Sequence, residues 1–150
     1  MSLQEIEALC VVPFSGASRA HRERLFYALE EVVQALLRAN IRCDVFVDGS
    51  FLTEKPEPDD VDIIVATDSG VFDALDEAQH QVLEALNTEP NALVDSLAIT
   101  TYPRDHRYRG YGLDGESMIE SYGIEHAQVY LKGYAVLRLW ETDVGNRICR

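Results

Sequence analysis

The fold of this chain is decided by residues 47–65, which read VDGSFLTEKPEPDDVDIIV. A β-branched and aromatic segment, residues 42–48, runs directly into the Gly-Ser pair, so we expect a strand that ends in a turn. Residues 55–58 carry two prolines one residue apart and predict a loop, because proline fits neither a helix interior nor a central strand. The apolar run that follows predicts a second, largely buried strand over residues 61–66.

Two features of this stretch suit an anionic ligand held together with a metal ion. Asp60 and Asp62 are two positions apart at the start of a strand, so both side chains point to the same face. Ionised carboxylates in this arrangement repel each other unless a cation lies between them, and Mg²⁺ or Mn²⁺ binds such oxygen ligands. Gly49 lets the backbone approach a phosphate closely. If a short helix begins at Ser50, its free amides and the serine hydroxyl would point at the anion.

Helical and strand patterns alternate along the remaining sequence, which predicts a single α/β (α+β) domain over residues 1–150. Apolar residues recur at helical spacing from Ser18 to Asn40, with Ser18 as the expected N-cap and Asn40 as a left-handed stop. We expect a third strand over residues 92–100, with Asp95 embedded in it.

A second helix is expected after a cap and turn at residues 68–70. Its expected buried positions are Val71, Leu75, Ala78, Val82 and Leu86. Residues 103–116 read as a polar loop and residues 116–122 as a short helix. Residues 128–139 fit either a strand or a terminal helix, and the pattern leaves that choice open.

Composition excludes several classes of function. The net charge of −13 opposes non-specific DNA binding, which depends on neutralising phosphates with Lys and Arg. No apolar run approaches the roughly 20 residues that span a bilayer, and no targeting segment is visible, so we expect no membrane association. The three cysteines are widely spaced and predict reduced thiols in a soluble, cytoplasmic protein.

The run over residues 47–65 resembles the nucleotidyltransferase superfamily, in which a Gly-Ser pair precedes Asp-x-Asp inside an apolar strand. A closer resemblance is to a bacterial group with the run Gly-Ser-Phe-x-Thr-x-Lys-Pro-x-Pro-x-Asp-x-Asp. Here that run comprises Gly49, Ser50, Phe51, Thr53, Lys55, Pro56, Pro58, Asp60 and Asp62. The resemblance extends loosely to the preceding helix and to Lys132-Gly133. It implies a nucleotidyltransferase-like mixed β-sheet flanked by helices.

The resemblance also implies an activity, the transfer of a nucleoside monophosphate from a nucleoside triphosphate to an acceptor. Asp60 and Asp62 would bridge two Mg²⁺ (or Mn²⁺) ions, and a third carboxylate would come from a later strand. Asp95 matches that position, and would bind the metal on the acceptor side and help to activate the acceptor hydroxyl. Catalysis would rest on positioning and charge neutralisation.

Four basic residues are further candidates for nucleotide binding. Arg104 and Arg107 belong to a basic, aromatic cluster at residues 104–111 that either contacts triphosphate or RNA, or forms a solvated loop paired with the acidic surface. Lys55 in the motif loop and Lys132 near the end either reach a phosphate or are ordinary surface lysines.

Two functions are compatible with the sequence. The first is a nucleotidyltransferase that modifies a protein, an RNA or a small molecule. The second is a non-catalytic nucleotide- or partner-binding module, such as a component of a toxin–antitoxin or defence system with a small helical partner protein. The repelling carboxylate pair favours the enzyme, because a binding module has no need of it. Acceptor binding would fall to residues 103–126, to a homodimer mate or to a partner protein.

Overall fold

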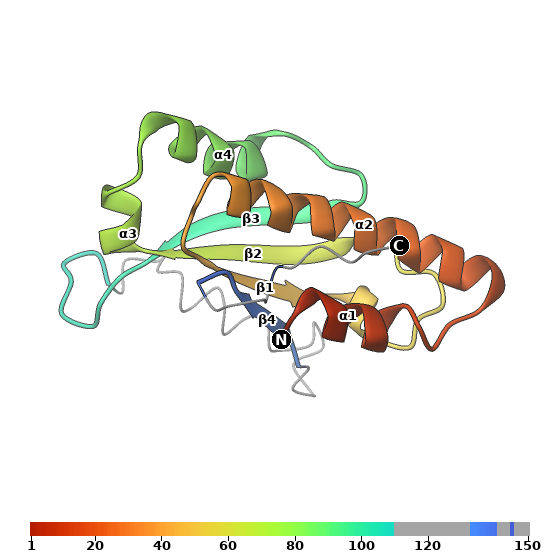
Figure 1. The fold of residues 1–150 in the computed structure, drawn as a ribbon. Coiled ribbons are helices and arrows are strands. Elements are labelled where there is room, and N and C mark those ends of the chain that lie inside the picture. The colour runs from red at the N-terminus through yellow and green to blue at the C-terminus, as the bar shows by residue number, and fades with distance from the viewer. Residues whose placement is uncertain (110–132, 141–144, 146–150) are drawn as a thin grey trace.

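The computed structural model describes residues 1–109, 133–140 and 145, which are coloured in Figure 1. The elements follow one another as α1 (Leu3–Cys10), α2 (Gly16–Arg38), β1 (Asp44–Asp48), η1 (Ser50–Leu52), β2 (Val61–Asp68), α3 (Ser69–Asp73), α4 (Glu77–Thr88), β3 (Val94–Thr101) and β4 (Ala135–Arg138). Here η1 is a single turn of 3₁₀ helix. Of the segments left open by the sequence, residues 135–138 form a strand; the short helix expected at 116–122 lies outside the described residues.

The four strands form one mixed sheet in the order β3-β2-β1-β4. β1 pairs antiparallel with both β2 and β4, whereas β2 and β3 are parallel. The parallel pair is joined through α3 and α4, as a parallel connection requires a crossover of this kind. The expected α+β architecture with a mixed sheet is therefore confirmed.

One face of the sheet is packed under helices. Val45 of β1 and Ile63 of β2 are fully buried and belong to the same apolar cluster as Leu3 of α1, Phe26 of α2 and Leu83 of α4. Figure 1 shows α1, α2 and α4 lying along the sheet. Side chains alternate between the two faces of a strand, so the residues next to these core positions face away from the helices.

The long helix α2 begins earlier than the sequence predicted. Its N-cap is Ser15, in extended conformation, so Ser18 lies within the first turn and the expectation of a cap there is wrong. At the other end Asn40 has φ of +54°, which confirms the left-handed stop. His21 and Arg22 lie in the second turn of the helix and face the loop described below.

The expected second helix is divided into α3 and α4. Asp76 and Gln79 form a capping box, in which the Asp76 carboxylate accepts from the Gln79 amide at 2.8 Å and the Gln79 side chain accepts from the Asp76 amide at 2.9 Å. This box begins a new helix and changes the buried face. Leu83 is buried, whereas Ala78 is exposed and was wrongly placed in the core.

None of the helices among the described residues combines the length and the apolar character needed to cross a bilayer.

Candidate functional site

Strand register places three aspartates in one row across the sheet. Asp48 of β1 is the register partner of Asp62 of β2, and Asp62 is in turn the partner of Asp95 of β3. Partners in register project from the same face. Their chain neighbours Val47 and Ile63 belong to the core beneath the helices, so the row lies on the opposite face of the sheet.

The environment changes along this row. Asp48 is buried, Asp62 is half-buried and Asp95, on the edge strand β3, is exposed. Asp60 is half-buried and lies one residue before β2 begins. The row therefore presents carboxylate oxygens from the middle of the sheet out to solvent at its β3 edge.

Gly49 lies directly against the Asp62 carboxylate. Its backbone has φ of +79° and ψ of −168°, a conformation that is essentially restricted to glycine. A Cβ atom on Gly49 would overlap Asp62 Oδ2. The glycine in the Gly-Ser pair is therefore required both by the backbone turn and by the carboxylate that packs on it.

The segment after Gly49 begins with a single turn of 3₁₀ helix, so the condition set by the sequence, a helical start at Ser50, is met by this one turn. Ser50 opens η1 and is half-exposed. The Thr53 hydroxyl donates to the Ser50 carbonyl at 2.8 Å and thereby closes the turn. The expected loop over residues 55–58 follows.

Arg22 of α2 holds this segment in place. Its guanidinium is fully buried and donates to the carbonyls of Cys10, Phe51 and Thr53, each at 2.8 Å, and of Lys55 at 2.5 Å. Burial lowers the pKa of Arg22. Arginine is nearly always exposed in proteins, but here both terminal nitrogens of a buried guanidinium donate to backbone carbonyls, three of them in the segment that follows Gly49, while Nε has no hydrogen-bond partner among the described residues.

Two further contacts complete the anchorage. The Arg22 guanidinium carbon lies 3.8 Å from the centre of the Phe14 ring, a cation–π contact. His21, the preceding residue of α2, donates from Nε2 to the carbonyl of Pro58 at 2.6 Å. Because α2 contacts the loop at both ends, the loop's path from Gly49 back to Asp60 is fixed by the helix.

Lys55 is engaged within the motif loop. Its ammonium forms an ion pair with Asp59 at 2.7 Å, and this hydrogen bond lowers the pKa of the Asp59 carboxyl. Both side chains are exposed, so the pair contributes little to stability. Lys55 is near the row in sequence, yet its charge is directed to a neighbouring acid.

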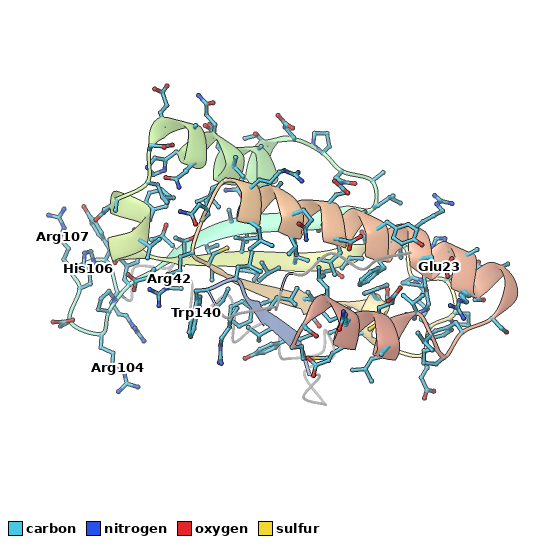
Figure 2. All side chains as sticks on the ribbon, viewed as in Figure 1. Glu23, Arg42, Arg104, His106, Arg107 and Trp140 are labelled. Atoms are coloured by element: carbon cyan, nitrogen blue, oxygen red, sulfur yellow. The ribbon has the colours of Figure 1, made fainter. Side chains whose placement is uncertain are left out.

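The basic loop after β3 lies at the other end of the sheet. Thr101, the last residue of β3, is about 20 Å along an extended strand from Asp95. Figure 2 shows Arg104 and Arg107 at one end of the molecule and Glu23 of α2 near the opposite end. The structure therefore does not bring these arginines to the row, and Lys132 lies outside the described residues.

Within residues 1–109 and 133–140, no three carboxylate, imidazole or thiol side chains form a group that could hold a metal ion. Asp60, Asp62 and Asp95 are therefore not an assembled three-ligand centre. Their chemistry nevertheless fits Mg²⁺ or Mn²⁺, because all three offer hard oxygen donors and two of them are register partners. Ionised carboxylates repel one another, so they would have to turn inward to share a cation.

Sequence reasoning missed Asp48, His21 and Arg22. The position of Asp48 could have been predicted, because it ends the strand before Gly49 and alternation along that strand places it with Asp44 and Phe46 on the face away from the core. Nothing in the sequence indicated the contacts of His21 and Arg22 with the loop, because a charged side chain in an amphipathic helix normally faces solvent.

Fold and site together define an α+β protein whose mixed sheet carries helices on one face and a row of aspartates on the other. The chain belongs to the Family of unknown function (DUF6932), which matches residues 1–138. No curated protein and no solved structure matches it.

Proposed function

We propose that this protein is a metal-dependent nucleotidyltransferase that moves a nucleoside monophosphate from a nucleoside triphosphate to an acceptor. The observation that carries the proposal is the register partnership of Asp62 and Asp95, with the backbone of Gly49 packed on the Asp62 carboxylate. A glycine turn, a short helical start and neighbouring carboxylates are the groups needed to hold a triphosphate with its cation.

Asp60, Asp62 and Asp95 would hold the magnesium or manganese. A bound divalent cation supplies neutralisation of the charge on the phosphates and on the leaving pyrophosphate. The backbone amides that follow Gly49 and the Ser50 hydroxyl would donate hydrogen bonds to phosphate oxygens. Arg22 would not touch the ligand, and its role would be to position the segment that does.

The transfer step requires an acceptor hydroxyl at the exposed end of the row. Its oxygen forms a bond to the α-phosphorus, the bond between that phosphorus and the oxygen bridging to the β-phosphate breaks, and pyrophosphate leaves. Asp95 is the most exposed of the three expected ligands, and it would accept the hydroxyl proton.

Calorimetric titration of ATP, GTP, CTP and UTP tests this proposal, with magnesium and with a chelator. Asp62→Asn keeps the shape of the side chain and removes its charge, whereas Asp73→Asn makes the same change at an exposed position of α3. We expect the wild type and Asp73→Asn to bind with the same magnesium dependence. In Asp62→Asn the affinity should fall at least about tenfold, the equivalent of about 1.4 kcal/mol.

No binding of any triphosphate, or equal binding in Asp62→Asn, would overturn the proposal. Magnesium-dependent binding without transfer of labelled nucleotide to any acceptor would point instead to the non-catalytic nucleotide-binding module.

A further inference from the structure

Two exposed aromatic side chains, at opposite ends of β4, line one hollow in the surface. Among the described residues, the aromatic side chains that are large and exposed are Tyr108, Tyr134 and Trp140. Tyr134 and Trp140 flank β4, and Tyr108 lies in the loop after β3. Trp140 is the only tryptophan of the chain and is 49% exposed, although indole surface is normally among the most buried.

Trp140 is held in a defined position by charged neighbours. Its indole Nε1 donates to the Asp44 carboxylate at 2.9 Å. The guanidinium carbons of Arg42 and Arg138 lie 5.2 Å and 6.0 Å from the centre of its ring. Exposed indole that is oriented by a hydrogen bond and by two arginines is preorganised for stacking, because little rotamer freedom is left to lose on binding.

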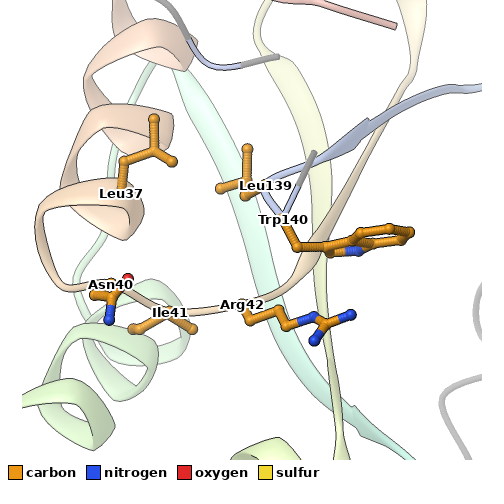
Figure 3. Close-up of a pocket in the computed structure, with 6 residues that line it drawn as sticks. All are labelled: Leu37, Asn40, Ile41, Arg42, Leu139 and Trp140. Atoms are coloured by element: carbon orange, nitrogen blue, oxygen red, sulfur yellow. The ribbon is translucent and has the colours of Figure 1, made fainter. Parts of the chain in front are cut away.

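The Arg42–Trp140 pair separates two hollows in the surface. The larger has a volume of about 640 Å³ and is lined in part by Asp44, Phe46, Asp68 and Tyr134. The smaller, of about 330 Å³, lies toward the end of α2, and Figure 3 shows Arg42 and Trp140 extending side by side from it. The larger hollow falls within the size range of small-molecule sites.

The side chains in and beside the larger hollow favour a ligand that has a flat ring, polar edges and a negative charge. Indole and phenol rings, with a guanidinium that stacks on the indole, offer flat surfaces to an aromatic ligand. Carboxylates at Asp44 and Asp68 and the Thr101 hydroxyl offer hydrogen-bond partners to its edge. Arg42 and Arg138 supply local positive charge for a phosphate in a chain whose net charge is −13. A flat heterocycle with polar edges and a phosphate is a nucleotide.

We propose that this hollow binds an unpaired nucleobase stacked on Trp140. The inference rests on the proposed function for the identity of the ligand, and it adds a base-recognition site that is separate from the carboxylate row. Asp44 and Asp48 are four residues apart on β1 and lie on the same face, about 13 Å from each other along the strand. The base belongs either to the triphosphate donor, if one ligand spans this distance, or to an acceptor RNA strand.

Tryptophan fluorescence reports on the site directly, because Trp140 is the only indole. ATP with magnesium and a short single-stranded oligoadenylate are each titrated into the full chain, and quenching is expected for at least one of them. Quenching by ATP that is lost in Asp62→Asn identifies the donor base. Quenching by the oligoadenylate that persists in Asp62→Asn identifies an acceptor base. Either result supports the inference.

Variants test the contact independently of fluorescence. Trp140→Ala should weaken binding of the quenching ligand about 5- to 100-fold in calorimetry, the usual effect of losing one base-stacking side chain. Arg42→Ala should weaken it about 2- to 5-fold. Arg24→Ala, at an exposed position of α2, is the matched control and should bind as the wild type does.

Failure of the inference and failure of the proposed function give different results. ATP binding without quenching, with unchanged affinity in Trp140→Ala, overturns the base site and leaves the nucleotidyltransferase proposal standing. Quenching by oligoadenylate without any triphosphate binding supports the base site and overturns the nucleotidyltransferase proposal. No quenching by either ligand overturns the base site.

Discussion

Gly49→Ala is the most informative single substitution in the motif, because it affects the backbone and the carboxylate row together. Gly49 has φ of +79° and ψ of −168°, where any residue with a Cβ is strained by about 1–3 kcal/mol. The new Cβ would also overlap Asp62 Oδ2 and press on the rest of that carboxylate. Asp62 must therefore leave its present position, or the turn must open.

We expect a total destabilisation of about 2–4 kcal/mol, since displacing Asp62 adds to the backbone strain. In a domain of this size that corresponds to a fall in Tm of roughly 5–15 °C. Urea denaturation and thermal unfolding measure it. Gly16→Ala is the control within the chain, because Gly16 also has positive φ, +57°, but a Cβ there meets nothing within 4 Å. Its expected cost is about 1–2 kcal/mol.

A double-mutant cycle separates the two contributions. In an Asp62→Ala background the overlap is gone, so Gly49→Ala should cost only the backbone strain, and the cycle should give a coupling of about 0.5–3 kcal/mol. Equal costs of Gly49→Ala in both backgrounds would refute the packing of Gly49 on Asp62. A cost no larger than that of Gly16→Ala would refute the argument as a whole.

Three other outcomes are expected. Arg22→Met should lower the free energy of unfolding in urea by about 2–6 kcal/mol, because buried carbonyls left without a donor cost about 1–3 kcal/mol each; a loss below 1 kcal/mol would contradict the anchoring role. Burial raises the pKa of the Cys10 thiol, and burial, with a smaller contribution from the Asp44 charge, raises the pKa of the Cys43 thiol to about 12. In a variant whose third cysteine is replaced by serine, both remaining thiols should therefore react with Ellman's reagent at about pH 8 only after unfolding. Hydrogen bonds from Ser2 lower the pKa of the Glu5 carboxyl, so its contribution to stability is complete above the ordinary glutamate range and is lost as pH falls through the folded-state pKa. The wild type should therefore be more stable than Glu5→Gln at neutral pH but not in acid, and a difference that persisted at about pH 2 would contradict this.

The strand–turn–loop–strand unit could be predicted because its signals are local. The apolar strand residues, the Gly-Ser pair and the two prolines each restrict the backbone within a few positions, and β1, η1 and β2 follow them closely. A local signal was also present for α1, since Ser2 and Glu5 form a capping box, but the short helix it begins was overlooked.

The division of the helix at Asp76 and the role of Arg22 could not be predicted from local sequence patterns. The spacing of Asp76 and Gln79 permits a capping box, yet a continuous apolar periodicity competes with it. Arg22 looks like one of several polar residues of an amphipathic helix. Its burial depends on carbonyls at residues 51, 53 and 55, and the approach of that segment is a tertiary event that helical periodicity does not encode.

The carboxylate row follows from the same register that builds the core. Side chains alternate along β2, so the pairing that buries Val61, Ile63 and Val65 under the helices also places Asp62 on the opposite face, beside Asp48 and Asp95. A slip of one residue would carry the Asp62 charge into the core and move Ile63 to the half-buried position that Asp62 occupies, at a cost of several kcal/mol. The row is therefore specified by apolar packing on the other side of the sheet. Substitutions that change core volume without changing register should lower stability and leave the row intact, whereas Gly49→Ala should disturb the row from its own face.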